Sequence, residues 1–456
     1  MTGYIGAASK GDMDTVAARL GPTEEFEGGA SGSVEKPRHR LRIVLAGAIG
    51  NVLEWYDFGL YGLLAPVLAS LFFPGHDRIA ALLGVYGGFA VGFVMRPVGA
   101  YALGYLADRI GRRYVLALTV LLIGLSTVAV GLLPTYESVG MWAPVLLIGV
   151  RMVQGFSVGG EFVDSVAYLV ESAPPGRRGL MGSFANLGST GGMLLAAAVA
   201  ATTTSLVRPE ALLGGVWRIP FLLGGVLACG AFLLRRKLPP TPMEVDAKER
   251  ETEVAPLRQA IRKQGWTLLA TLCFTSGYGI VNYLTMVLLP TYAREFGGMT
   301  DGQALRINTA GQALALFVVP LSGWLSDHAW TRRRVLSVIF ATEAVVGWKC
   351  FELVKDHGAA GLLVAQLVFA FLLAMVMGSD PAMLAEQFKS EYRVSAHAVA
   401  FNIGIGLFGG TAPMIGMALI RKTGNTMAPA VYLIVAASIA AVSILLLQDN
   451  SRKAIE

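Results

Sequence analysis

Long apolar runs recur along this chain from residue 41 to residue 449, with short polar loops between them. About 20 apolar residues are needed to cross the roughly 30 Å hydrocarbon core of a bilayer. Only 15% of the residues are charged and the mean hydropathy is +0.58, whereas soluble proteins carry about 25% charged residues. The sequence therefore predicts an all-α integral membrane protein and excludes a soluble enzyme, a fibrous protein and a disordered chain.

Twelve membrane spans fit into the chain as two groups of six. The first group is predicted at 43–73, 79–106, 114–133, 141–170, 180–206 and 215–234. The second is predicted at 267–292, 302–327, 335–354, 360–388, 396–420 and 427–448. We thus expect a six-helix bundle at 41–234, a cytoplasmic linker at 235–265 and a second bundle at 266–448. Residues 1–40 are expected to form a disordered cytoplasmic tail, and residues 449–456 a shorter one.

Positive charges are distributed unevenly between the two sides of these spans. If both termini are cytoplasmic, about 24 of the 37 Lys and Arg residues lie on the cytoplasmic side. The positive-inside rule therefore predicts a multi-pass protein of the plasma (inner) membrane with both termini in the cytoplasm. The same bias explains the net charge of +6, so we expect lipid and no nucleic acid as a partner, and a monomer.

Two similar loops indicate that the halves are repeats. Residues 104–113 read Gly-Tyr-Leu-Ala-Asp-Arg-Ile-Gly-Arg-Arg, and residues 323–334 read Gly-Trp-Leu-Ser-Asp-His-Ala-Trp-Thr-Arg-Arg-Arg. Paired halves of this kind are typical of transporters whose site lies near the membrane midplane. Acids and arginines in and near these loops can latch the halves together. The candidate gating residues are Arg96, Asp108, Arg112, Glu161, Glu171 and Asp327.

Four further segments, 50–58, 151–161, 217–221 and 401–413, complete a recognisable set of motifs. Together with the loop at 104–113 they resemble the metabolite:H+ symporters of the major facilitator superfamily, over residues 41–448. The resemblance implies twelve helices in two pseudo-symmetric bundles and proton-coupled uptake. Similar members carry α-ketoglutarate, citrate, shikimate, proline or betaine. Asp164 and Asp380 depart from the family pattern, and their role is left open.

Charged residues inside the predicted spans point to a central site. Glu54, Asp57 and Tyr61 share one face of span one, because they are spaced by three and four residues. Arg151 lies at a similar depth in span four. A charge near the bilayer centre costs about 2.5–3.5 kcal/mol, so we expect Arg151 to face Glu54 or Asp57. Such a pair either binds substrate and proton or only stabilises the bundle.

Roles follow from the side-chain chemistry. The planar, permanently charged fork of Arg151 suits a carboxylate, so we expect Arg151 to bind substrate and Asp57 to carry the coupling proton. Glu54 is an alternative proton carrier, and Asp164 is either a gate residue or a second proton site. Further candidate substrate ligands are Gln154, Tyr61, Tyr278, Asn282 and Asn402. For Tyr278 and Asn282 on span seven, helix packing is the alternative.

The expected function is proton symport of a small organic acid, such as a di- or tricarboxylate, by alternating access. A zwitterionic osmolyte of the proline or betaine type is the alternative substrate. A proton-driven exporter and a ligand sensor without transport are the alternative functions. The chain has no Walker motif, no catalytic triad and no metal-type spacing of its cysteines and histidines. We therefore expect no enzyme, metal or organic cofactor, with the proton gradient as the energy source.

Overall fold

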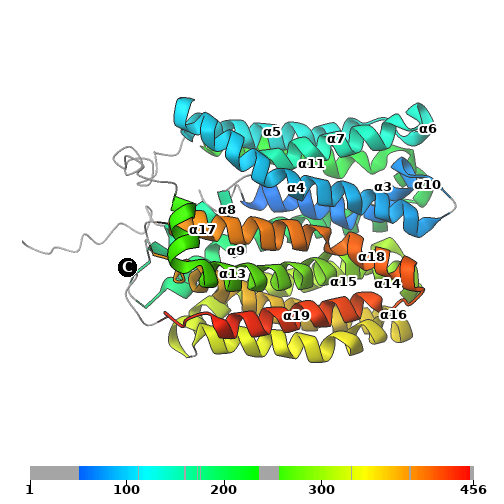
Figure 1. Ribbon diagram of the computed structural model, residues 1–456. Coiled ribbons are helices and arrows are strands. Elements are labelled where there is room, and N and C mark those ends of the chain that lie inside the picture. Colours follow the sequence, from blue (N-terminus) through cyan, green and yellow to red (C-terminus); the bar gives the residue numbers. More distant parts are fainter. Residues whose placement is uncertain are drawn as a thin grey trace, which may run out of the picture. The chain divides into compact units, whose positions relative to one another are not determined.

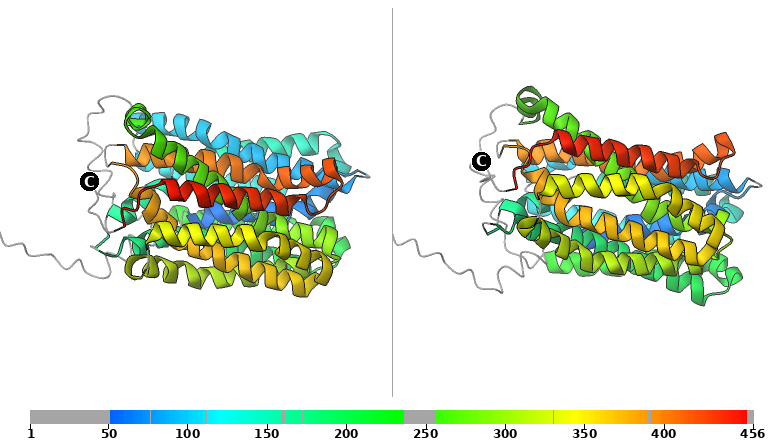
Figure 2. Two further views of the ribbon diagram at one scale, coloured as in Figure 1. Left: turned by 60° about the horizontal axis from the view of Figure 1, so that its bottom comes forward. Right: turned by 90° about the horizontal axis from the view of Figure 1, so that it is seen from below.

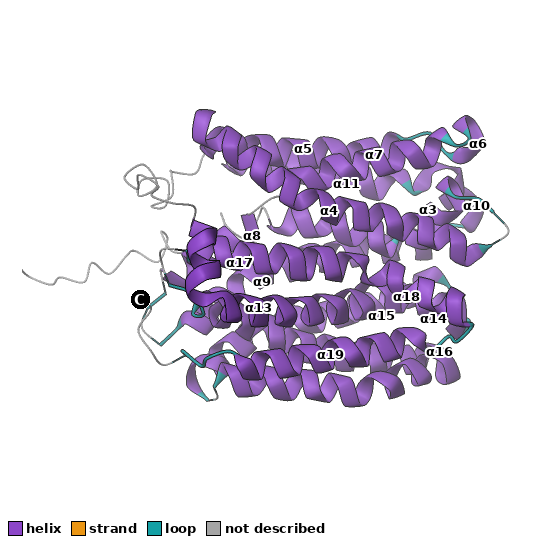
Figure 3. Cartoon of the chain, viewed as in Figure 1, coloured by secondary structure: helices purple, strands orange, loops and turns teal. Residues whose placement is uncertain are grey.

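The computed structural model describes residues 51–451 except 76, 111, 159–160, 172, 175, 236–255, 330 and 390–391. Every regular element in this part of the chain is helical (Figure 3). Seven helices are long and apolar enough to cross a membrane, and two bent helix pairs raise the number to nine. Each of the twelve predicted spans overlaps a described helix. The predicted tail 1–40 and most of the predicted linker lie outside the described residues.

The first half begins with the helix Asn51–Leu63, which bends by 62° into α3 (Ala65–Phe72). Pro66 stands near the start of α3, where its missing N–H removes no helical hydrogen bond. The remaining elements of this half are α4 (Arg78–Ile110), α5 (Arg112–Leu132), α6 (Tyr136–Val139), α7 (Trp142–Ser157), α8 (Glu161–Glu171), α9 (Arg178–Leu206), α10 (Pro209–Ala211), η1 (Leu212–Val216) and α11 (Arg218–Arg235).

The second half contains one very long element, α16 (Arg332–Ala385), which turns at Gly358. Gly358 has a φ of 53°, a left-handed conformation that costs glycine little because it has no Cβ. The element therefore holds the predicted spans nine and ten. The others are α13 (Pro256–Tyr283), η2 (Leu284–Leu288), α14 (Leu289–Gly297), α15 (Asp301–His328), α17 (Arg393–Phe401), η3 (Asn402–Gly409), α18 (Gly410–Thr423) and α19 (Ala428–Leu446).

One predicted span boundary is wrong. Span four, expected as one helix over 141–170, ends at Ser157 and resumes at Glu161 as α8, because Val158 leaves helical geometry just before a glycine pair. The helix α13 begins at Pro256, within the predicted linker, and leaves helical geometry at Gln264, close to the predicted end of that linker at residue 265.

The helices lie side by side and run between two ends of the bundle (Figures 1 and 2). We call the end that carries Arg178, Arg332 and Arg393 the basic end, and the other the opposite end. Between the halves, α9 packs along α15 and α16, while α4 packs against α18 and η3. These two contact regions bring the candidate residues of both halves together.

Candidate functional site

Arg151 and Asp57 form a buried ion pair inside the first half. Arg151 Nη1 lies 3.0 Å from Asp57 Oδ2, and both side chains are at most 1% exposed. Asp57 Oδ1 also accepts hydrogen bonds from Thr127 Oγ1 at 2.7 Å and Gln154 Nε2 at 2.6 Å. Gln154 Oε1 in turn accepts one from Arg151 Nη1 at 2.6 Å. This carboxylate is therefore compensated by a cation and by two neutral donors.

A close contact between two helices sets the position of Arg151. A Cβ on Gly155 of α7 would lie 1.8 Å from the carbonyl oxygen of Gly92 on α4. Only glycine permits this approach, since any side chain would push the two backbones apart. Arg151 stands one turn before Gly155 on the same face, so the glycine contact fixes its depth and its direction.

Glu54 and Arg96 form a second buried pair, with 3.0 Å between Glu54 Oε1 and Arg96 Nη2. The sequence placed Arg96 in the gating network at the end of its span, and that placement is wrong. The helix α4 continues through Pro97 to Ile110, so Arg96 lies about 21 Å before its end at 1.5 Å per residue. Its guanidinium instead lies 4.5 Å from the ring centre of Phe58.

Aromatic rings enclose both guanidinium groups. Arg151 lies 4.2 Å over the ring of Tyr61, whose hydroxyl donates to the Val85 carbonyl oxygen at 3.1 Å. Tyr61 thus supports the arginine instead of extending into a cavity. Among the buried donor groups without an acceptor in the described part of the chain, four belong to these arginines and to the adjacent Tyr283. They are Arg151 Nε, Arg151 Nη2, Arg96 Nε and the Tyr283 hydroxyl.

A small cavity of about 20 Å³ lies between the two halves. That volume suits a water molecule and is far too small for an amino acid. Trp55 lines it and stacks on Tyr283, with 6.4 Å between ring centres. Among the predicted substrate ligands, Asn282 lines the cavity. Its other lining residues are Ser189, Thr190, Met193, Met286, Gln312, Ala315, Ala370, Leu373, Ala374 and Met377.

Tyr278 and Asn402 do not line this cavity. The Tyr278 ring packs against Phe274 and Phe340, with ring centres 6.2 Å from both. Asn402 Nδ2 donates to the Ala398 carbonyl oxygen of its own helix at 3.0 Å. Tyr278 therefore packs against other rings, and Asn402 bonds the backbone of its own helix, instead of facing the cavity.

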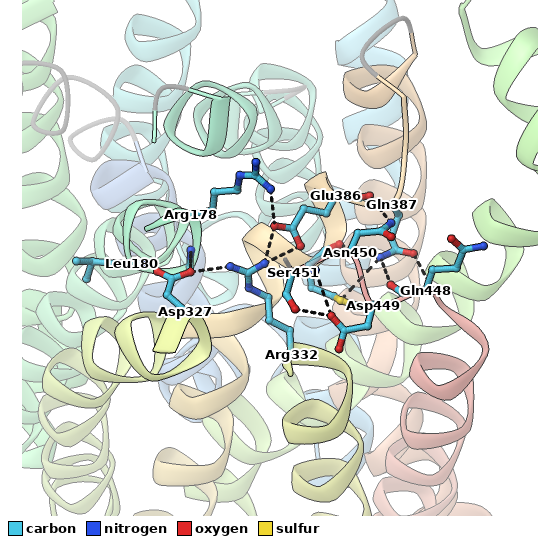
Figure 4. A network of polar contacts seen from close by, with 12 residues as sticks. Arg178, Leu180, Asp327, Arg332, Glu386, Gln387, Gln448, Asp449, Asn450 and Ser451 are labelled. Atoms are coloured by element: carbon cyan, nitrogen blue, oxygen red, sulfur yellow. Dashed lines mark hydrogen bonds and ion pairs between the residues drawn. The ribbon is translucent and has the colours of Figure 1, made fainter. Parts of the chain in front are cut away.

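A polar network joins the halves at the basic end (Figure 4). Asp327 accepts hydrogen bonds from the backbone N–H groups of Gly179 and Leu180 at 2.7 and 2.9 Å, at the start of α9. A carboxylate is stabilised there by the positive end of the helix dipole. Arg332 then links Asp327 at 2.7 Å to Glu386 at 2.5 Å.

Two further contacts strengthen the basic end. Glu171 accepts a hydrogen bond from Arg393 Nη1 at 2.7 Å, and the rings of Phe162 and Phe401 stack with 4.5 Å between centres.

Beside the network, burial acts to raise the pKa of Asp449, but hydrogen bonds from its neighbour Ser451 outweigh this effect, so the pKa is lowered. The remaining gate candidates, whose side chains lie outside the described part, are Asp108, Arg112, Glu161 and Asp164.

The opposite end is also bridged. Arg78 Nε lies 3.1 Å from Glu295 Oε1, and the Tyr86 hydroxyl donates to Thr291 Oγ1 at 2.9 Å. Each contact joins α4 of the first half to α14 of the second. In this conformation, polar contacts among the described residues therefore join the halves at both ends.

Two buried acids of the second half have no cationic partner. Asp380 accepts a hydrogen bond from Asn186 Nδ2 at 3.0 Å, across the interface between the halves. Glu343 is fully buried, and neither of its oxygens has a hydrogen-bond partner among the described residues. The sequence interpretation missed Glu343, although an acid inside an apolar run was the signal. No group of three or more potential metal-ligating side chains occurs among the described residues.

The family model described as the Major Facilitator Superfamily matches residues 47–328 of this chain. The chain belongs to the Major Facilitator Superfamily. One relative, the ectoine/proline transporter of Corynebacterium glutamicum, is 33% identical over 91% of this chain and 86% of its own length. The proline/betaine transporter of Escherichia coli is 31% identical, over 90% of this chain and 84% of that protein.

Solved structures of superfamily members share the fold. The crystal structure of a D-xylose–proton symporter has a TM-score of 0.72 at 17% identity, covering 91% of this chain and 100% of that chain. An inward open xylose transporter from Escherichia coli has a TM-score of 0.68 at 17% identity, covering 88% and 94%. The predicted all-α facilitator fold is thereby confirmed, and the protein is a multi-pass membrane transporter.

Proposed function

We propose that this facilitator is a proton-coupled symporter that takes up a zwitterionic osmolyte of the proline, betaine or ectoine class. The relatives are named for those solutes. These names favour a zwitterion, which was the alternative substrate, and disfavour the di- or tricarboxylate that we expected first. A zwitterion still presents a carboxylate, so the chemistry predicted for Arg151 applies to it unchanged.

The buried Arg151–Asp57 pair is the observation that carries this proposal. Arg151 uses Nη1 for Asp57 and Gln154, while Nε and Nη2 have no acceptor. A substrate carboxylate on that free edge competes with Asp57 for the positive charge. Asp57 then gains proton affinity, because the cation that stabilised its charged form is shared. Substrate and proton thus bind together.

The aromatic surroundings suit the other end of a zwitterion. Trp55 borders the central cavity, and Phe58, Phe89, Phe93 and Tyr283 pack around the two arginines. The faces of such rings attract quaternary and secondary ammonium groups. A tricarboxylate gains nothing from them.

The two bridged ends act as alternating gates in this proposal. The basic end faces the cytoplasm of the plasma membrane, as the charge bias predicts, and both termini lie there. The transporter works as a monomer, with the proton gradient as its energy source and no other cofactor. Substrate enters when the contacts at the opposite end separate, and leaves when those at the basic end do.

Uptake into proteoliposomes with an alkaline interior tests this function. Labelled proline, betaine, ectoine, α-ketoglutarate and citrate are offered side by side, with protein-free liposomes as the control. Accumulation of a zwitterion that collapses with a protonophore is expected. Accumulation of only α-ketoglutarate or citrate contradicts the substrate class. Accumulation that survives the protonophore contradicts proton coupling.

A further inference from the structure

Asp380 lies at the interface between the halves, between the central cavity and the basic end. It stands three residues after Met377, which lines the cavity, and six residues before Glu386 of the basic-end network. At 1.5 Å per residue these separations are about 4.5 and 9 Å along the axis. Its carboxyl group is 1% exposed and contacts the Asn186 amide of the other half.

The charge balance at Asp380 differs from that at every other buried acid between the halves. Its described side-chain partner is neutral, and no arginine, lysine or histidine of the described chain pairs with it. An isolated carboxylate in a low-dielectric interior is so costly that the group takes up a proton instead. Asp57, in contrast, faces a guanidinium and two neutral donors.

The titratable groups around Asp380 do not supply the missing charge. On α13 and the first part of α16, the titratable groups in this region are Tyr278 and Glu343, and neither is a cation. From α9 the neighbour is Asn186, and on the α15 side Ser322 bonds Ser379 at 3.1 Å. Arg178 and Arg332, at the basic end, are engaged with Glu386. The Asn186 amide donates one hydrogen bond to Asp380, but none of these neighbours brings a positive charge to it.

We propose that Asp380 is a second proton-binding site, which takes up a proton from the opposite side of the membrane when that end is open, holds it while the basic end is closed, and releases it when the basic end opens. Separation of α9 from α16 breaks the Asn186–Asp380 hydrogen bond and admits water. The carboxyl O–H bond then breaks, the proton passes to water on that side, and the carboxylate is hydrated. The proposal rests on the proton coupling of the proposed function, and adds a second proton-carrying residue to Asp57.

Glu343 provides a matched comparison for this idea. It is as deeply buried as Asp380 and also lacks a cationic partner. It lies within the second half, beside the Phe340 and Tyr278 rings, so separation of the halves leaves its surroundings intact. Both acids are protonated in the closed state by the same argument, but only Asp380 changes its solvent exposure.

Infrared spectroscopy of the reconstituted full-length protein tests the proton directly, without transport. The carboxylic C=O stretching band at neutral pH should lose intensity in Asp380→Asn and, separately, in Glu343→Gln. Asp380→Glu should restore a band at a shifted frequency. This shift tests the proton on residue 380 even if the asparagine variant folds poorly. An unchanged band in Asp380→Asn shows that Asp380 is ionised and overturns the proposal.

The ratio of protons to solute separates a proton carrier from a buried structural acid. In proteoliposomes with imposed pH and voltage gradients, Asp380→Asn should move fewer protons per solute than the wild type, and Glu343→Gln the same number. Equal ratios in wild type and Asp380→Asn overturn the role in coupling. If the wild-type protein shows no proton-driven uptake, the proposed function fails, while the infrared result still decides whether Asp380 holds a proton.

Discussion

The two halves share one architecture but treat the buried acids that lie between the two ends of the bundle in opposite ways. In the first half, Glu54 and Asp57 each lie 3.0 Å from an arginine nitrogen. In the second half, Glu343 and Asp380 have no cation beside them in the described part of the chain. The first half can therefore keep its charges inside the membrane, whereas the second half avoids charge by holding protons. The same mutation should have different effects in the two halves.

Removing the arginine from the first half should have the largest effect. Arg151→Leu leaves Asp57 buried without its cation, and breaking a buried pair in this way costs about 3–5 kcal/mol. We expect a strongly lowered unfolding temperature in detergent and no uptake. The double variant Arg151→Leu/Asp57→Asn should regain most of the stability but no transport. Equal unfolding temperatures for the single and double variants would show that the pair is not the source of the loss.

Neutralising Asp57 should separate proton coupling from substrate binding. Asp57→Asn keeps an acceptor for Thr127 and Arg151 but cannot take up the coupling proton. Accumulation driven by a pH gradient should fall to the level of empty liposomes, while exchange of labelled for unlabelled solute continues. Intact accumulation in this variant removes Asp57 from the coupling mechanism.

Weakening the basic end should expose the interface where the second half holds its proton. Arg332→Gln breaks the bridge from Asp327 to Glu386. A cysteine replaces Ser183 in a variant without native cysteines. When Arg332→Gln is added, its thiol should react about tenfold faster with a water-soluble reagent, which corresponds to a free-energy change of about 1.4 kcal/mol. Arg78→Gln at the opposite end is the matched control and should not speed the reaction. If both variants behave alike, the network does not specifically close the basic end.

The smallest effect is expected at Glu343. Glu343→Gln removes no ion pair, so the stability should change by less than about 1 kcal/mol. Glu54→Gln removes a charged hydrogen bond to Arg96 and should cost about 1.5–3 kcal/mol. Thermal unfolding of both variants, measured in the same detergent, compares the halves directly. A larger loss at Glu343 than at Glu54 would mean that Glu343 has a charged partner.

Helix depth and spacing were enough to predict much of the fold and part of the site. Arg151 lies at a similar depth in span four to the acids of span one, so a pair between these spans followed from geometry along each helix, but the choice between Glu54 and Asp57 did not. The partner of Arg96 did not, because spacing along one helix does not show which residue of another helix lies opposite it. The bridge between Arg332 and Glu386 also escaped, since it depends on how distant segments pack.

Glu343 and the break in span four show a second limit. Hydropathy averages over a window, so one acid in an apolar run, or one non-helical residue such as Val158, barely changes the signal. Both features depend on what surrounds the residue in three dimensions. The substrate class was also undecided, because an arginine fork accepts the carboxylate of an organic acid and of a zwitterion equally well.

The cavity of about 20 Å³ between the halves has a consequence for the proton gradient across the membrane. A carrier that closed around a solute-sized void would hold a column of water, along which hydronium could cross without cargo. Here a single water fits, and Trp55 and Tyr283 stack beside it. The closed carrier therefore holds no solute-sized column of water between its halves through which hydronium could cross.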